Sequence, residues 1–184
     1  MVNICETKSD EWFTPSCAVY PILKYIKSGS TVWCPFDTDD SNFVKVLKSK
    51  GFNVINTHII NDDEDFFGLN FPTCDYIISN PPYSLRNEVL DRLFKIGKPF
   101  AILMNTNGLF DSRIRWDLFK NNNFSLIYLK GRTSFMQEYG VEQKTSPPFQ
   151  SAYICSGLSD KQILFEERSE SDVNVATGET EDKK

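Results

Sequence analysis

Residues 75–83, Asp-Tyr-Ile-Ile-Ser-Asn-Pro-Pro-Tyr, join a short apolar run to two consecutive prolines. Residues 75–79 have the length and the apolar character of a buried β-strand. The two prolines end this strand, because proline has no N–H group with which to continue a β-ladder. We therefore expect residues 80–83 at a strand end, where α/β sheets bind their ligands.

Helices and strands alternate on both sides of this segment. We expect helices at residues 16–28, 41–51, 84–96 and 113–120, and strands at residues 31–33, 52–60, 75–79, 99–104, 125–129 and 151–155. This order predicts an α/β domain with a mainly parallel sheet. The last two strands have no helix between them, which predicts an antiparallel closing pair. We expect one domain at residues 1–158 and an acidic, flexible terminal segment at residues 159–184.

The composition excludes several kinds of protein and site. No apolar run approaches the ~20 residues that cross a bilayer, and the N-terminus has neither the basic nor the apolar region of a secretory signal. We therefore expect a cytoplasmic protein. The five cysteines form no C-x-x-C pair and His58 is the single histidine, so we expect no metal site. The shortage of histidine also favours chemistry that needs no protein nucleophile.

Each residue of Asn80-Pro81-Pro82-Tyr83 suits chemistry on an aromatic amine. The lone pair of such an amine is delocalised into its ring, and two acceptors that take both N–H bonds make the nitrogen a better nucleophile. The side-chain oxygen of Asn80 and the backbone carbonyl of Pro81 can be these acceptors. Pro82 biases Pro81 toward an extended backbone, and Tyr83 offers a flat face to a base that is rotated out of its stack.

This segment resembles the acceptor motif of the S-adenosylmethionine-dependent amino-methyltransferases, and particularly of the small adenine N6-methyltransferase-like proteins of phages and prophages. Other parts of residues 10–157 are similar to the cofactor segments and the closing hairpin of that family, namely Trp12-Phe13-Thr14-Pro15, Val32-Trp33-Cys34-Pro35-Phe36-Asp37, Asp65-Phe66-Phe67, Gly131-Arg132 and Ser146-Pro147-Pro148-Phe149. The resemblance implies a somewhat reduced Rossmann-like class I methyltransferase sheet. It also implies S-adenosylmethionine as the cofactor, adenine in DNA as the acceptor and the cytoplasm of a bacterial host as the location.

The resemblance assigns roles to individual residues. The catalytic residues are Asn80, Pro81, Pro82 and Tyr83, and the cofactor-binding residues are Trp12, Phe13, Thr14, Pro15, Cys34, Pro35, Phe36, Asp37, His58, Asp65 and Phe66. The cofactor loop departs from the family, because Cys34 stands in place of an acidic residue and residues 36–40 contain no glycine. The acid that grips the ribose has no clear match, although His58 lies near its place. A decayed cofactor site is the alternative interpretation.

Charge is distributed unevenly along the chain. The net charge is −5, yet residues 85–150 hold ten basic and six acidic side chains. Local charge decides the attraction to phosphates, and we expect Arg86, Arg132 and Lys144 to contact nucleic acid. Residues 137–144 are the candidate for base recognition. Solvated helix faces are the alternative explanation of this charge.

Two further questions stay open at the level of sequence. Similar acceptor motifs serve methyltransferases that act on RNA bases or on glutamine side chains, so the motif does not identify the acceptor by itself. The second class of function is a non-enzymatic binder, in which a methyltransferase-like domain grips a protein or a nucleic acid. The altered cofactor loop and the acidic residues 159–184 favour this alternative.

Overall fold

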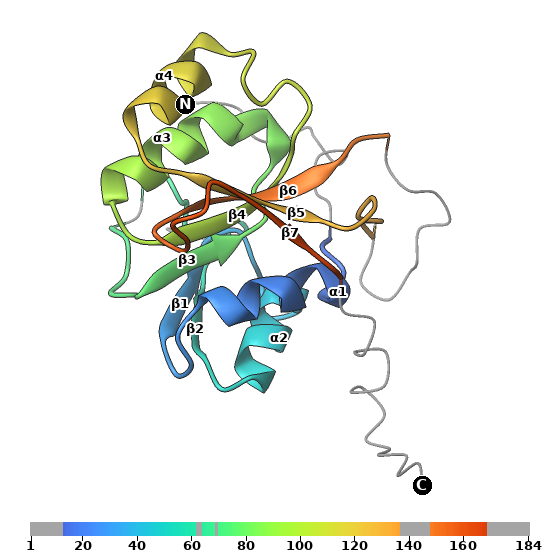
Figure 1. The fold of residues 1–184 in the computed structure, drawn as a ribbon. Coiled ribbons are helices and arrows are strands. Elements are labelled where there is room, and N and C mark those ends of the chain that lie inside the picture. Colours follow the sequence, from blue (N-terminus) through green and yellow to red (C-terminus); the bar gives the residue numbers. More distant parts are fainter. Residues whose placement is uncertain (1–12, 62–63, 69, 137–147, 169–184) are drawn as a thin grey trace, which may run out of the picture.

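The computed structural model describes residues 13–61, 64–68, 70–136 and 148–168 of the chain. Seven strands form one sheet in the order β2-β1-β3-β4-β6-β5-β7 (Figure 1). The strands are β1 (Thr31–Cys34), β2 (Asn53–Asn56), β3 (Tyr76–Ser79), β4 (Phe100–Asn105), β5 (Ser125–Leu129), β6 (Ser151–Ser156) and β7 (Ile163–Glu166). β6 is antiparallel to both of its neighbours, β4 and β5, and the other pairings are parallel. The predicted α/β sheet, mainly parallel with an antiparallel closing pair, is confirmed.

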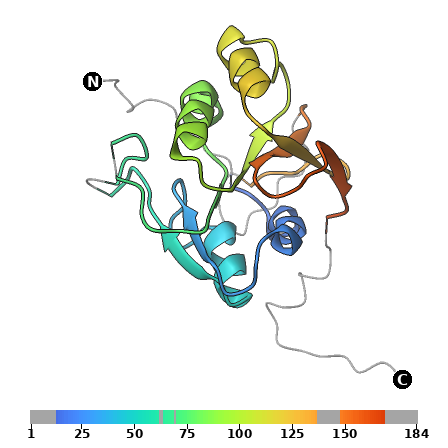
Figure 2. The same cartoon turned by 60° about the vertical axis from the view of Figure 1, so that its left-hand side comes forward.

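Helices cover both faces of the sheet (Figures 1 and 2). They are α1 (Ser16–Val19), the 3-10 helix η1 (Tyr20–Tyr25), α2 (Asn42–Ser49), the 3-10 helix η2 (Tyr83–Leu85), α3 (Arg86–Ile96) and α4 (Arg113–Asn121). α1, η1 and α2 lie on one face, and α3 and α4 lie on the other. No helix in the described part of the chain is long and apolar enough to cross a membrane.

The alternation of side chains along each strand creates two core clusters, one on each face of the sheet. In β1, Val32 and Cys34 belong to the cluster under α1 and α2, whereas Trp33 belongs to the cluster under α3 and α4. In β3, Ile78 joins the first cluster and Ile77 joins the second. The central strands are therefore buried on both faces, which explains why their sequences are continuous apolar runs.

Several predicted boundaries were wrong for identifiable reasons. The expected helix at residues 16–28 is divided into α1 and η1, since Pro21 lies in the first turn of η1 and cannot donate a backbone hydrogen bond. The helix expected at residues 84–96 begins later, because Ser84 lies in η2 and Leu85 takes the N-cap position of α3. Ser41 caps α2 by accepting a hydrogen bond from Phe43 N at its Oγ, and Gly97, with a φ of 70°, ends α3.

Two strands differ from the expectation. The predicted strand at residues 52–60 is shorter, because β2 ends at Asn56. β7 was not predicted, and it adds a parallel strand beside β5 within the segment that we expected to be separate from the domain. The sheet therefore extends past residue 158, and residues 169–184 lie outside the described residues.

Candidate active site

Two loops begin side by side at the carboxyl edge of the sheet, where ligands bind in open α/β folds. β1 ends at Cys34 and β3 ends at Ser79. The two strands are parallel neighbours, so both ends lie at the same edge. The loop after β1 (residues 35–41) therefore starts next to residues 80–83, which we call the NPPY segment.

The carboxylate of Asp37 joins these two loops. One of its oxygens accepts a hydrogen bond from Ser41 Oγ, and the other accepts one from Ser79 Oγ. Asp37 is 6% exposed and Ser79 is fully buried. Because Ser41 is also the cap of α2, Asp37 connects the loop after β1, the start of α2 and the end of β3. Ser79 was not singled out from the sequence, although a serine that ends a buried strand needs a hydrogen-bond partner.

The protonation of Asp37 is set by its surroundings. Burial raises the pKa of Asp37 from 3.8 to about 6, and the hydrogen bonds from Ser41 and Ser79 oppose this rise. Desolvation disfavours the charged form, whereas hydroxyl donors favour it. The carboxylate therefore accepts from both serines at neutral pH. Below a pH of about 6 it gains a proton and one oxygen becomes a donor, so the network must rearrange.

Backbone hydrogen bonds hold the loop after β1 against the chain that follows β2. Thr57 N donates to Cys34 O at 3.1 Å, and Asp37 N donates to Thr57 O at 3.2 Å. Trp33 Nε1 donates to Thr57 Oγ1 at 3.0 Å. These contacts fix the direction of residues 35–37 without a glycine. The buried side chains of Cys34 and Asp37 point away from solvent.

Aromatic rings surround the end of the NPPY segment. Asn80 is half-buried and Pro81 is buried. The ring of Tyr83 meets Phe135 and Phe149 in edge-to-face contacts, with centroid distances of 6.3 and 5.7 Å. Phe149, which belongs to the predicted end of the closing hairpin, therefore lies against the NPPY segment. Phe135 was not singled out from the sequence.

The N-terminal segment reaches the same region. Phe13 forms an antiparallel bridge with Met136, and Thr14 O accepts a hydrogen bond from Asn42 Nδ2 at 2.8 Å. Pro15 takes the cap position of α1. Thr14 Oγ1 is buried and has no hydrogen-bond partner among the described residues. Trp12, which we also expected to bind the cofactor, lies outside the described residues.

Phe66 lies in the core. It is 2% exposed, and its ring lies 4.8 Å from that of Phe36 and 5.6 Å from that of Trp33. The guanidinium carbon of Arg92 lies 5.2 Å from the centre of the Phe66 ring. The Asp65 carboxylate accepts a hydrogen bond from Phe67 N at 3.1 Å. The structure thus brings the Phe36 and Phe66 rings into contact and packs the Phe66 ring against protein.

The turn after β2 contains a carboxylate that the sequence analysis missed. Glu64 Oε2 accepts hydrogen bonds from Asn61 Nδ2 at 2.7 Å and from His58 N at 3.1 Å. These two hydrogen bonds lower the pKa of Glu64. His58 Nδ1 accepts from Ile60 N at 3.2 Å, so this ring nitrogen is used within the turn. A carboxylate that is anchored by two hydrogen bonds therefore lies in the turn after β2, close to His58.

The predicted nucleic-acid contacts are only partly described. Arg86 donates from Nη1 to Asn107 O at 3.0 Å, which ties the start of α3 to the loop after β4. Arg132 is exposed and follows β5, and its backbone carbonyl accepts from Arg168 Nη1 at 2.8 Å. Lys144 and residues 137–144 lie outside the described residues.

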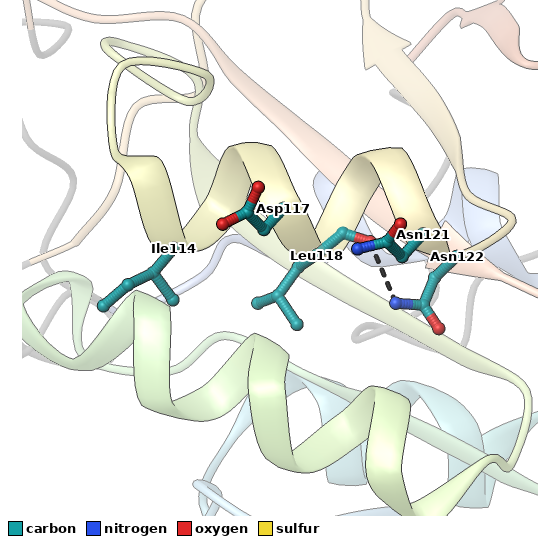
Figure 3. Close-up of a pocket in the computed structure, with 5 residues that line it drawn as sticks. All are labelled: Ile114, Asp117, Leu118, Asn121 and Asn122. Carbon is teal, nitrogen blue, oxygen red and sulfur yellow. Dashed lines mark hydrogen bonds between the residues drawn. The ribbon is translucent and has the colours of Figure 1, made fainter.

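A separate, shallow hollow of about 310 Å³ lies at α4, away from the carboxyl edge of the sheet. Ile114 and Leu118 point from α4 toward α3, and Asn122 Nδ2 donates to Leu118 O at 2.9 Å (Figure 3). Asp117 is the charged side chain in its lining. With one carboxylate and two apolar side chains, this hollow offers less chemistry than the carboxyl edge, which remains the candidate active site.

Two solved structures are similar to this fold. The methyltransferase subunit of a type I restriction-modification system from Streptococcus thermophilus has a TM-score of 0.50 at 13% identity, and the match covers 88% of this chain and 48% of that subunit. A protein described as the modification subunit of a type I restriction enzyme from Vibrio vulnificus YJ016 has a TM-score of 0.47 at 14% identity, covering 86% of this chain and 47% of that one.

The present chain spans about half the length of each of these subunits. No family model and no curated protein matches the sequence. At 13% identity, the likeness to the Streptococcus thermophilus subunit concerns the backbone and not the residues of a site. The chain therefore shares the α/β fold of a methyltransferase subunit.

Proposed function

We propose that this protein transfers a methyl group from S-adenosylmethionine to the N6 amine of adenine in DNA, as the resemblance to phage and prophage proteins implies. One observation carries the proposal: the NPPY segment directly follows β3 at the carboxyl edge, and Ser79, the residue before it, is bonded to Asp37 of the neighbouring loop. This arrangement puts an acceptor segment and a candidate donor loop next to each other, as group transfer requires.

The acceptor side needs no protein nucleophile. Asn80 Oδ1 and the carbonyl of Pro81 accept the two N–H bonds of the adenine amine, which concentrates the lone pair on nitrogen. Tyr83 supports the base, since its ring is held in place by Phe135 and Phe149. The amine loses its proton during or after the transfer. The rate then depends on positioning and on electrostatics.

The residues proposed to bind the methyl donor include one buried polar group that a ligand could satisfy. The buried Thr14 hydroxyl has no partner among the described residues, and a ligand that supplies one would remove the free-energy penalty of leaving it unpaired. We assign Phe13, Thr14 and Pro15, together with Pro35 and Phe36, to the binding of S-adenosylmethionine. When bound, S-adenosylmethionine supplies a methyl group activated by a sulfonium.

Other residues have revised roles in this proposal. The Asp37 carboxylate is a positioning group, because it accepts hydrogen bonds from two serines in the protein interior. Glu64 takes the place of the missing ribose acid, since its carboxylate is anchored at the turn after β2. Asp65 and Phe66 form the wall beside Phe36, and His58 supports the turn.

A catalytically degenerate binder is the second candidate function. Phe66 is packed between protein side chains and Arg92, and the loop after β1 contains no glycine that would let its backbone approach a ligand closely. In this alternative, the same edge of the sheet grips a nucleic acid or a protein without methyl transfer.

Calorimetry with S-adenosylmethionine separates the two functions. Our proposal expects saturable binding by the full chain, and mass spectrometry of the digested product should then identify N6-methyladenine in DNA. Parallel reactions with RNA and with a glutamine peptide test the other acceptors. If calorimetry detects no binding at millimolar S-adenosylmethionine, the proposed methyltransferase activity is contradicted, and the non-enzymatic binder is the function that stands.

A further inference from the structure

A second feature of the carboxyl edge lies beyond the candidate active site. A hollow of about 540 Å³ opens where β5 and β7 end. The lining residues are Tyr128, Leu129, Lys130, Gly131, Gln150, Phe165, Glu166 and Glu167. β5 runs parallel to β4 and β3, because β6 is antiparallel to both β4 and β5. The hollow therefore faces the same edge as the NPPY segment.

A pair of aromatic rings, the half-buried Tyr128 and the exposed Phe165, forms one wall of this hollow. Tyr128 and Phe165 lie directly opposite each other in the β5–β7 register, and their rings stack at a centroid distance of 5.9 Å with planes 24° apart. Phe165 is 79% exposed, although a phenylalanine gains free energy from burial. Such a flat, exposed aromatic surface suits the stacking of another planar ring.

The backbone around the hollow is held by side chains. Gln150 Nε2 donates to Leu129 O at 3.2 Å and to Gly131 O at 3.1 Å. Arg168 donates from Nε to Lys130 O at 2.8 Å. Gly131 has a φ of 73°, and a Cβ there would lie 2.9 Å from Arg168 Nη2. Side-chain hydrogen bonds therefore fix the backbone of residues 129–131 at the rim of the hollow.

Among the residues that the structure describes, the charge around the pair is positive. Lys24 is bonded to Glu166, and Lys130 pairs with Glu167. The guanidinium groups of Arg132 and Arg168 have no carboxylate partner among the residues that the structure describes. Four basic and two acidic side chains thus leave a surplus of two positive charges, which complements phosphate.

We propose that the Tyr128–Phe165 pair stacks an unpaired base of single-stranded DNA, while Arg132 contacts the backbone beside that base. The choice of DNA rests on the proposed function. An aromatic platform with positive charge at its rim is the arrangement that binds single strands without reading their sequence. In the substrate, the stacked base would lie a few nucleotides from the one that enters the acceptor site, because β4 and β6 separate β3 from β5 in the sheet.

Fluorescence anisotropy of the full chain with a labelled oligothymidine tests this platform. Phe165→Ala should weaken binding by roughly fivefold or more, the lower limit of a lost base–aromatic stack. Phe165→Trp should bind as tightly as the wild type, because it keeps a flat ring. Ile163→Ala is the matched control: Ile163 is 54% exposed on the same strand but offers no ring, so its loss should change binding by less than about twofold.

Three results would overturn the platform. They are an absence of oligothymidine binding by the wild type, an unchanged affinity in Phe165→Ala, and an equal loss in Ile163→Ala. Sedimentation at the assay concentration tests a second copy as the occupant, and a dimer that Phe165→Ala dissociates without a change in DNA affinity would also contradict the proposal. The binding of S-adenosylmethionine is measured separately, so the platform and the proposed function can fail independently.

Discussion

Ser79 donates a hydrogen bond to Asp37 across 42 residues of sequence and between two neighbouring loops. The bond joins the last residue of β3, which directly precedes Asn80, to the loop that follows β1. Because both residues are buried, a substitution at either one should change the free energy of unfolding as well as any activity. The Asp37–Ser79 hydrogen bond therefore joins the loop after β1 to the residue that directly precedes the NPPY segment.

The stability of the protein should depend on the protonation of Asp37. Its folded pKa of about 6 lies above the value of 3.8 expected for the unfolded chain, so the folded state favours the protonated carboxyl. The stabilisation is fully present below pH 3.8 and is lost as the pH rises through 6. Each pKa unit corresponds to about 1.4 kcal/mol. The difference in unfolding free energy between the wild type and Asp37→Asn should therefore shift by about 2 kcal/mol between pH 4 and pH 7.5.

Urea unfolding of both proteins at several pH values checks this expectation. Asp37→Asn should gain stability relative to the wild type as the pH rises, because the variant has no carboxylate to desolvate. A stability difference that is the same at pH 4 and pH 7.5 would show that Asp37 does not titrate in this range.

Ser79→Ala should destabilise the protein more at high pH than at low pH. Above the pKa of Asp37, the variant leaves a buried carboxylate with one donor fewer, and lost hydrogen bonds to charged groups are worth about 1.5–3 kcal/mol. Ser49→Ala is the control, since Ser49 donates to Val46 O on the surface of α2. Urea midpoints at pH 5 and pH 8 provide the measurement, and equal losses at both values would contradict the role of Ser79 as a donor to Asp37.

Thr14→Val should separate ligand binding from stability. The Thr14 hydroxyl is buried without a partner among the described residues, so its replacement by a methyl group should stabilise the ligand-free protein by about 1 kcal/mol. The same change should weaken the binding of S-adenosylmethionine, by about tenfold for one lost hydrogen bond. Thermal melts and calorimetry measure the two effects. Unchanged affinity would remove Thr14 from the donor site.

Phe66→Ala should behave as a core truncation. Phe66 packs against Trp33 and Phe36, and the loss of a buried phenylalanine costs about 3–5 kcal/mol. Phe67→Ala is the control, because Phe67 is 36% exposed and should lose much less on truncation. If urea unfolding gives similar losses for the two variants, Phe66 does not fill the core as described.

Arg132→Gln should lower the salt dependence of DNA binding. If Arg132 neutralises one phosphate of a single strand, its removal reduces the slope of log affinity against log salt by about 0.7 on single-stranded DNA. Arg113→Gln is a charge-matched control, since Arg113 is exposed on α4. Anisotropy at several salt concentrations gives the slopes, and equal slopes for the wild type and Arg132→Gln would mean that Arg132 touches no phosphate.

The sequence could predict the central strands because they are buried on both faces. The apolar run that ends in Ser79 is continuous for this reason, and the prolines after it end the strand where the structure does. β7 carried a weaker pattern, with exposed Ile163 and Phe165 alternating with half-buried Leu164 and Glu166. An edge strand of this kind is specified by its pairing with β5, which no local pattern reveals.

The sequence indicated which residues belong to the candidate site but not which of them form hydrogen bonds with one another. The NPPY segment is local, so its position after β3 followed from the sequence. The bond between Asp37 and Ser79 spans 42 residues and exists because β1 and β3 are neighbours in the sheet. In the same way, Glu64 reaches the end of β2 through a turn whose hydrogen bonds are set by the folded backbone.

A methyl-transfer assay on Asn80→Ala tests whether Asn80 is an acceptor for the adenine amine. The wild type and the control Asn123→Ala, an exposed position before β5, should both form N6-methyladenine in DNA, as counted by nucleoside mass spectrometry. Asn80→Ala should bind S-adenosylmethionine and melt like the wild type but form no product above background, because it lacks one of the two acceptors for the amine. Product formation by Asn80→Ala at the wild-type rate would contradict the proposed acceptor site.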